Sequence, residues 1–275
     1  MAKTIYTGIA GVARKVKQPY VGVAGVARKV KAGYLGVGGV ARQFFAGGIP
    51  LSTLAVGTSV YLKISGTAKE FFVIHQGRPS ITYDTSCDGT WLLMKDCYTN
   101  RAFDSADHDY ANSDIHTYLN GTFYNSIDST VRSAIKNVKI PYRAGVTPSV
   151  TVETGSSGLS TKVFLLSATE VGFSNEGWCP VEGSKLSYFP SGNSTNRSLR
   201  IANYGGNAVY WWLRSPSGHP GDYAETNYYE WIYQVGDTGS VSTTFNVTQN
   251  SYVYVRPALI FPSTQLVDAS YNIIA

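Results

Sequence analysis

The chain has 275 residues, of which 43% are hydrophobic, 13% aromatic and only 15% charged, and its formal net charge is +5. This length suits one large domain with a small appendage, and the low charge with abundant Gly, Ser, Thr, Asn and Tyr favours short strands and many turns. No apolar run is long enough to cross a membrane, and basic residues interrupt the N-terminal segment, so we expect neither membrane insertion nor a secretory signal.

Three copies of a 14-residue repeat begin at Tyr6, Tyr20 and Tyr34. Each copy has a short apolar piece, a central glycine and the sequence Val-Ala-Arg, which predicts about two strands per repeat and a small β-meander overall. The first fifty residues carry a charge of +8, which leaves −3 for the rest of the chain. We interpret residues 1–48 as an attachment or oligomerisation module. A solvated basic arm is the alternative, and without an RNA-binding signature we expect no nucleic-acid partner.

The main domain, residues 49–275, begins with predicted strands and continues with two predicted helices. Apolar runs bounded by turn residues predict strands at residues 59–64, 70–77 and 90–96. One helix is predicted at residues 112–121, where Ser113 can cap its start and Gly121 can end it. The other is predicted at residues 127–138, from the apolar spacing of Val131, Ile135 and Val138.

Strands dominate the remainder of the main domain. Ser167 and Glu170 have the spacing of a capping box. Further strands are predicted at residues 162–166, 208–215, 230–235, 240–245 and 252–261. Because both helices come early, with strands before and after them, the order indicates an α+β fold with two helices and a mostly antiparallel sheet.

Several segments of the main domain carry a family resemblance. The sequences VFLLSATEVG, VYWWLRSP and VRPALIFPS, together with matches from about Leu54 to Ser263, resemble a domain-of-unknown-function family of Firmicutes and their phages. The resemblance implies a C-type-lectin-like fold, related to that of formylglycine-generating enzymes. The family is similar to the variable proteins of diversity-generating retroelements, in which a reverse transcriptase copies a template with errors at adenines. The 14-residue repeats look like segments of phage structural proteins.

The resemblance implies a diversified ligand-binding surface at about residues 217–254. This stretch contains no Lys, Arg or Met and is rich in Tyr, Asn, Ser and Thr, a mixture that antibody loops also use for contacts. The residues assigned to this surface are His219, Asp222, Tyr223, Asn227, Tyr228, Tyr229, Glu230, Trp231, Thr244, Phe245, Asn246, Thr248, Asn250 and Tyr252. Adenine errors in an Asn codon cannot produce Glu or Trp, so Glu230 and Trp231 are constant positions or this chain is not diversified.

In the predicted strand between the two loops of this surface, alternate side chains lie on opposite faces. Tyr229, Trp231, Tyr233 and Val235 share one face, which is more apolar and is expected to be buried, while Tyr228, Glu230, Ile232 and Gln234 share the other. The loops at residues 217–227 and 243–251 are expected to be exposed.

The tryptophans and arginines in the segments that carry the resemblance have a structural interpretation. We expect at least one of Trp211 and Trp212 to fill the core. Arg214 and Arg256, the latter followed by Pro257, are expected to form hydrogen bonds or ion pairs beneath the ligand-binding surface.

Motifs for catalysis, metals and cofactors are missing from the sequence. The four histidines lack metal-ligand spacing, and no P-loop, nucleophile elbow or metalloprotease motif is present. The acidic stretch at residues 104–114 lacks EF-hand spacing and is interpreted as a capped polar loop. Three cysteines without Cys-x-x-Cys spacing predict buried free thiols, although a Cys87–Cys97 bridge remains open. The late cysteine pair of formylglycine-generating enzymes is absent, so we expect no enzyme, no metal and no cofactor.

The functional hypothesis is a non-enzymatic receptor-binding protein at a phage tail tip. Its expected partners are a host-cell surface receptor, either protein or glycan, and virion tail components that bind the repeats. A homotrimer is expected because adhesins gain avidity from several linked sites. The alternatives are an undiversified bacterial surface or secreted adhesin and, less favoured, an enzyme.

Overall fold

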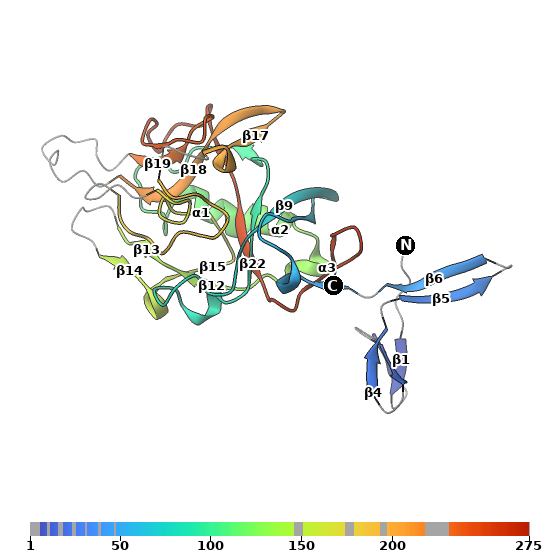
Figure 1. The fold of residues 1–275 in the computed structure, drawn as a ribbon. Coiled ribbons are helices and arrows are strands. Elements are labelled where there is room, and N and C mark those ends of the chain that lie inside the picture. Colours follow the sequence, from blue (N-terminus) through green and yellow to red (C-terminus); the bar gives the residue numbers. More distant parts are fainter. Residues whose placement is uncertain are drawn as a thin grey trace, which may run out of the picture.

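The computed structural model describes residues 51–145, 151–173, 179–192, 197–217 and 231–274, and in the N-terminal region the strands with residues 19, 30 and 48–50 (Figure 1). In the described residues, strands far outnumber helices. Figure 1 shows the N-terminal hairpins outside the main domain, to which they connect through β7 (Ile49–Pro50). No described helix is long and apolar enough to cross a membrane.

Each N-terminal repeat forms one antiparallel hairpin. The hairpins are β1 (Tyr6–Ile9) with β2 (Val12–Lys15), β3 (Tyr20–Val23) with β4 (Val26–Lys29), and β5 (Ala32–Val37) with β6 (Val40–Ala46). The first two hairpins have the same register: Tyr6 lies opposite Lys15, and Tyr20 lies opposite Lys29. Each hairpin is a separate two-stranded sheet, so the expected continuous meander is wrong. Pairing closes within each repeat, because the two strands of a repeat are joined by only two residues and meet at the lowest loop-closure cost.

A five-stranded antiparallel sheet forms one half of the core, in the order β16-β22-β10-β9-β8. Its strands are β8 (Ser59–Ile64), β9 (Thr67–Gln76), β10 (Thr90–Met94), β16 (Val163–Phe164) and β22 (Ala258–Phe261). The central strand β10 is buried along its whole length, as its continuous apolar sequence demands. The predicted strand at residues 59–64 is confirmed with the same bounds.

A second sheet carries the candidate site, in the order β11-β21-β18-β19-β20, with β17 paired to β18. Its strands are β11 (Thr99–Asn100), β17 (Ala202–Tyr204), β18 (Asn207–Pro216), β19 (Ile232–Val235), β20 (Val241–Ser242) and β21 (Val253–Val255). β18 and β21 are parallel and the other pairs are antiparallel. Arg256 and Pro257 connect β21 to β22 and so join the two sheets.

Short elements complete the main domain. β7, β23 (Leu266–Val267) and β24 (Ile273–Ile274) form a small sheet, and β12 (Val138–Ile140) pairs with β15 (Leu159–Thr161), as β13 (Tyr142–Arg143) does with β14 (Val152–Glu153). Single 3₁₀ turns lie at Leu51–Thr53, Thr85–Cys87, Gly155–Ser157 and Arg197–Arg200.

One helical run of 13 residues is present where a 10-residue helix was predicted. It consists of α1 (Asp114–Tyr118), a π-helical turn (Leu119–Phe123) and α2 (Tyr124–Ser126). The Ser113 hydroxyl accepts the backbone N–H of His116 at 3.3 Å, which confirms the predicted cap. Gly121 does not end the helix but lies within the π-helical turn, because Leu119 and Phe123 on either side of it are buried and hold the chain helical.

The second predicted helix is wrong, and with it the two-helix, C-type-lectin-like α+β assignment. Only α3 (Ser129–Arg132) is helical in residues 127–138. Val131, Ile135 and Val138 are buried as their spacing predicts. The chain nevertheless leaves the helix, because the Lys136 N–H bonds to the Ile260 carbonyl and Val138 begins the pairing of β12 with β15. Sheet pairing thus overrides the helical period, and the main domain is predominantly β with several sheets.

Candidate functional site

A buried ion pair holds β18 beneath the site. The Arg214 guanidinium donates to both oxygens of Glu170, over 2.7 Å from Nη1 and 2.8 Å from Nη2, and both side chains are fully buried. Glu170 also accepts the Ser167 N–H at 2.9 Å and its own N–H bonds to the Ser167 hydroxyl at 3.0 Å, which confirms the predicted capping box. The Tyr83 hydroxyl adds a bond of 2.9 Å to Glu170, and burial raises the pKa of that phenol well above its usual range.

A second buried carboxylate lies close to the first. Glu182 accepts the Arg143 backbone N–H at 2.8 Å and a short hydrogen bond from the Ser215 hydroxyl. Burial raises the pKa of Glu182, and the opposing influence of Arg214 and of these hydrogen bonds is too small to reverse that shift. Ionisation of this buried carboxyl at neutral pH therefore costs folding free energy. Its hydrogen bond from Ser215 supports β18.

The second signature arginine anchors the end of β21. Arg256 is buried and donates to the carbonyls of Met94 at 2.8 Å, Lys95 at 3.0 Å and Arg200 at 3.1 Å. Its guanidinium carbon lies 4.9 Å from the centroid of the Trp211 ring. Pro257, which follows, is buried as well. The expectation that both arginines form structural bonds or ion pairs is confirmed.

Both tryptophans are fully buried, which confirms that they belong to the core. Trp211 donates from its indole N–H to the Arg200 carbonyl at 2.9 Å, and Trp212 donates to the Arg101 carbonyl at 2.8 Å. The Trp212 bond ties β18 to the backbone immediately after β11. The tryptophans thus shape the site from beneath and are not available for stacking on a ligand.

The structure covers only the second half of the predicted ligand-binding surface. His219, Asp222, Tyr223, Asn227, Tyr228, Tyr229 and Glu230 lie outside the described residues. Thr244, Thr248, Asn250 and Tyr252 are exposed, while Trp231, Phe245 and Asn246 are half-buried. Trp231 forms an isolated antiparallel bridge with Asn246, and a His108 ring nitrogen lies 3.1 Å from the Trp231 carbonyl.

The prediction of one buried face for β19 is too simple. Ile232, Tyr233, Gln234 and Val235 are all buried, so the strand is covered on both faces. The Gln234 amide oxygen accepts the N–H of Thr244 at 3.0 Å, and its amide nitrogen donates to the Phe245 carbonyl at 2.7 Å. A buried side-chain amide can in this way supply hydrogen-bond partners to the backbone of a loop. The two-residue alternation of a strand does not indicate such a role. Gln234 therefore fixes the start of the exposed loop.

Exposed and half-buried aromatic side chains form a row above the second sheet. Phe245 contacts Tyr210 edge-on, with ring centroids 5.1 Å apart, and lies parallel to Tyr252 at 6.3 Å. Tyr252 is 63% exposed, and burying such a ring in a contact gains both apolar area and a hydroxyl partner. This aromatic row of Tyr210, Phe245 and Tyr252 is thus a surface suited to an external partner.

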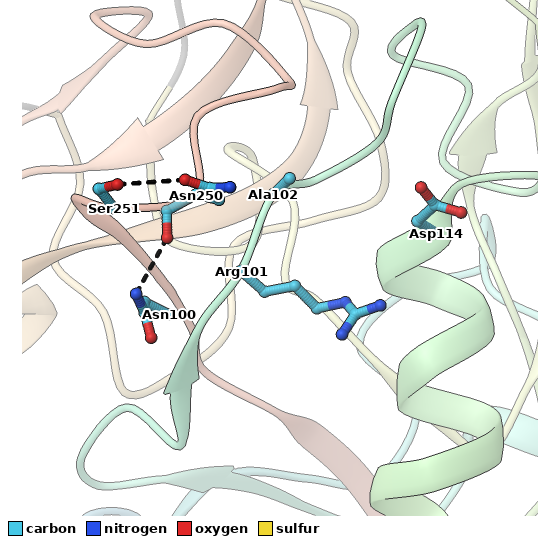
Figure 2. Close-up of a pocket in the computed structure, with 6 residues that line it drawn as sticks. All are labelled: Asn100, Arg101, Ala102, Asp114, Asn250 and Ser251. Carbon is cyan, nitrogen blue, oxygen red and sulfur yellow. Dashed lines mark hydrogen bonds between the residues drawn. The ribbon is translucent and has the colours of Figure 1, made fainter.

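An open hollow of about 500 Å³ includes Ser251, the sequence neighbour of Tyr252, in its lining (Figure 2). We call it the polar depression; its lining residues are Asn100, Arg101, Ala102, Asp114, Asn250 and Ser251. The Asn100 amide donates to the Asn250 carbonyl at 3.0 Å, and this bond joins the end of β11 to the loop before β21. The Arg101 guanidinium carbon lies 4.5 Å from the centroid of the Tyr118 ring on α1.

Sequence reasoning assigned Asn250 to the ligand-binding surface but missed Asn100, Arg101 and Asp114. These three come from a segment far away in the chain, which the pairing of β11 with β21 brings to the loop. The available signal was a polar Asn-Arg pair at the end of a short strand, with Asn100 as its last residue and Arg101 directly after it, a position where binding residues are common.

The acidic stretch at residues 104–114 is a capped polar loop, as predicted. Asp104 accepts the backbone N–H groups of Ala106 at 2.8 Å, Asp107 at 3.2 Å and Asp114 at 2.9 Å. Its carboxylate thus holds the loop closed at the start of α1. Across the described ranges, no group of three or more His, Cys, Asp and Glu side chains is placed to hold a metal ion.

The three cysteines are free thiols, so the Cys87–Cys97 bridge is not formed. Cys87 and Cys97 are buried as predicted, whereas Cys179 is partly exposed. Burial raises the pKa of Cys87 and of Cys97 to about 12, which leaves both as unreactive thiols.

Comparison with known proteins places the site within a family. No curated protein and no solved structure matches the chain. Residues 88–263 match the model of one protein family, and all six residues that line the polar depression lie within this range. Because the match covers more than half of the sequence, the chain belongs to the family described as Domain of unknown function (DUF6273).

Proposed function

We propose that this chain is a non-enzymatic receptor-binding protein whose contact surface consists of the polar depression and the loop at residues 243–252. The observation that carries the proposal is the position of Asn250, Ser251 and Tyr252, which are exposed at the rim of a hollow while the residues beneath are locked in buried bonds. Polar and aromatic side chains on a loop above a rigid scaffold are the usual arrangement of a recognition surface.

The hydroxyl in the depression favours binding over catalysis. Ser251 Oγ bonds to the amide oxygen of Asn250 at 3.1 Å (Figure 2). An amide cannot remove a proton from a serine, so this contact does not activate a nucleophile. An enzyme is accordingly the weaker candidate.

The N-terminal hairpins are proposed to attach the protein to other virion tail components or to further copies, as a trimer at a phage tail tip. Tyr20, Val21 and Val26 are 63%, 51% and 59% exposed, and a two-stranded hairpin with uncovered apolar side chains gains stability from a partner. An undiversified bacterial surface or secreted adhesin is the alternative for the same contact surface.

Host-cell adsorption tests the binding proposal. The purified full chain, carrying a fluorescent label, should bind host cells saturably, and the double variant Asn250→Ala/Tyr252→Ala should lose most of that binding. A matched control, Asn112→Ala/Tyr271→Ala, changes an exposed Asn and an exposed Tyr outside the depression and should bind as the wild type. Equal adsorption by all three proteins contradicts the proposed surface.

The tail-tip and diversification proposals need separate tests. Electron microscopy of particles that lack the gene should show a missing tail feature, and an unchanged tail contradicts the virion assignment. Sequencing the gene in a propagated population should reveal substitutions at adenine positions of codons 217–254. A population without them contradicts diversification but leaves receptor binding untouched.

A further inference from the structure

The polar depression contains two opposite charges that are not paired with each other. Arg101 and Asp114 are both exposed and both line the hollow. In the described part of the chain the ion pairs are Lys95–Glu70 and Arg214–Glu170, so neither Arg101 nor Asp114 is neutralised. Figure 2 shows the Arg101 side chain extended toward α1, with Asp114 at the start of that helix. A ligand in the hollow can therefore meet a strong donor and a strong acceptor together.

Arg101 is held in an orientation that suits a carboxylate. Its guanidinium lies 4.5 Å from the centroid of the Tyr118 ring, so the ring restrains the cation by a cation–π contact. Burial raises the pKa of Tyr118, which keeps the phenol neutral. A guanidinium stacked by its face still presents its N–H edge, and that edge matches the two oxygens of a carboxylate.

The remaining lining groups suit hydroxyls. Asp114 supplies acceptor oxygens, while the Asn100 amide oxygen and the Asn250 amide nitrogen have no hydrogen-bond partner in the described residues. Ala102 is the one apolar side chain among the six that line the depression, so the hollow itself presents mainly polar groups. Tyr252, next to Ser251, offers an exposed ring on which a sugar ring can stack.

We propose that the polar depression binds an acidic saccharide, with the sugar carboxylate on Arg101 and sugar hydroxyls on Asp114 and Asn250. This inference rests on the proposed function and names the chemical class of the receptor group. A neutral sugar leaves Arg101 without a counter-charge. A short zwitterionic peptide, whose two termini can meet both charges, is the competing ligand in the test.

Binding of the full chain to small probes tests the inference. Glucuronic acid, galacturonic acid and N-acetylneuraminic acid are titrated by saturation-transfer NMR and calorimetry, beside glucose, galactose and glycylglycine. At least one acid should bind about tenfold more tightly than the neutral sugars, which is the difference that one charge-assisted hydrogen-bonded contact supplies, and it should also bind more tightly than glycylglycine. Arg101→Gln should weaken that acid about tenfold, and Asp114→Asn should weaken it by a smaller factor.

Arg132→Gln is the matched control, because the Arg132 guanidinium also lies over a tyrosine ring, 5.5 Å from the Tyr124 centroid, but outside the depression. The affinity of the Arg132→Gln protein for the acid should equal that of the wild type.

Four results would overturn the inference. They are failure of all three acids to bind, equal affinity for acids and neutral sugars, stronger binding of glycylglycine, and equal losses of affinity in Arg101→Gln and Arg132→Gln. Host-cell adsorption of the same variants separates the two proposals: adsorption without acid binding overturns this inference alone, whereas acid binding without adsorption overturns the receptor function alone.

Discussion

Arg214 and Glu170 form a two-bond ion pair with no solvent access, at 2.7 Å and 2.8 Å. The pair connects β18 to the turn after β16, and the Arg214 Nη1 also donates to the Leu165 carbonyl at 2.8 Å. Two buried charges of this kind are stable only as a complete set, because each has given up its hydration. The pair is therefore the most sensitive point of the framework under the candidate site.

Glu170→Gln should lower the free energy of unfolding by about 3–5 kcal/mol, since it leaves the buried Arg214 charge without its counter-charge. Urea denaturation measures the change. Lys95→Met serves as the control, because Lys95 and Glu70 form a pair with side chains 42% and 25% exposed, and its loss should cost less than about 1 kcal/mol. A Glu170→Gln protein within about 1 kcal/mol of the wild type contradicts the assigned role.

Glu182 should make stability depend on pH. Burial raises the pKa of its carboxyl above the ordinary value of 4.5, so the folded protein binds this proton more tightly than the unfolded chain does. The stability contributed by this group is complete below the unfolded pKa and is lost as the pH rises through the folded pKa. Glu182→Gln, which resembles the protonated form, should therefore gain stability relative to the wild type as the pH rises above about 4.5. Urea titrations at a series of pH values measure the difference.

Glu70 provides a control, because its pKa is lowered whereas that of Glu182 is raised. Burial alone would raise the pKa of Glu70, but hydrogen bonds from Ser59 and Lys95 outweigh burial and lower it. Its stabilising contribution is present above the unfolded pKa and lost as the pH falls, so Glu70→Gln should lose stability relative to the wild type as the pH rises. If the stability difference from the wild type changes with pH in the same direction for Glu70→Gln and Glu182→Gln, the raised pKa assigned to Glu182 is wrong.

Asn120 should be a stability determinant of the helical run. Its amide oxygen accepts the N–H groups of Lys162 at 3.0 Å and Val163 at 3.2 Å, and its amide nitrogen donates to the carbonyls of His116 at 3.1 Å and Val163 at 3.0 Å. Asn120→Ala should cost about 2–4 kcal/mol, because it leaves several partly buried backbone groups without partners. Asn112→Ala, which removes one exposed contact to Asp109, should cost under about 1 kcal/mol in the same urea assay.

Tyr252 and Trp212 should separate function from stability. Tyr252→Ala should change the free energy of unfolding by less than about 0.5 kcal/mol, because the ring is mostly exposed, and should weaken host-cell adsorption. Trp212→Ala should cost about 3–5 kcal/mol, because it empties a fully buried site and removes the bond to the Arg101 carbonyl. Thermal unfolding and adsorption are measured on both variants. A strongly destabilised Tyr252→Ala protein would mean that this tyrosine belongs to the framework instead.

Local patterns were sufficient for several features of the fold. The Ser113 cap and the reciprocal bonds of Ser167 and Glu170 join residues three apart in sequence, and the strand at Ser59–Ile64 pairs with β9, the next strand along the chain. The burial of Trp211 and Trp212 follows from their size and apolar neighbours. For the Ser113 cap and the Ser167–Glu170 bonds, the deciding interaction lies within the segment that carries the pattern.

The sequence by itself thus determined several local elements, the burial of Trp211 and Trp212 and one rim of the candidate site. Tertiary structure decided that the helix runs through Gly121, that a strand begins at Val138 and that both faces of β19 are buried. It alone brought Asn100, Arg101 and Asp114 to Asn250. The physical reason is that sheet pairing and burial depend on partners distant in the chain, and a local hydrophobic period records that a residue is buried but not which segment covers it.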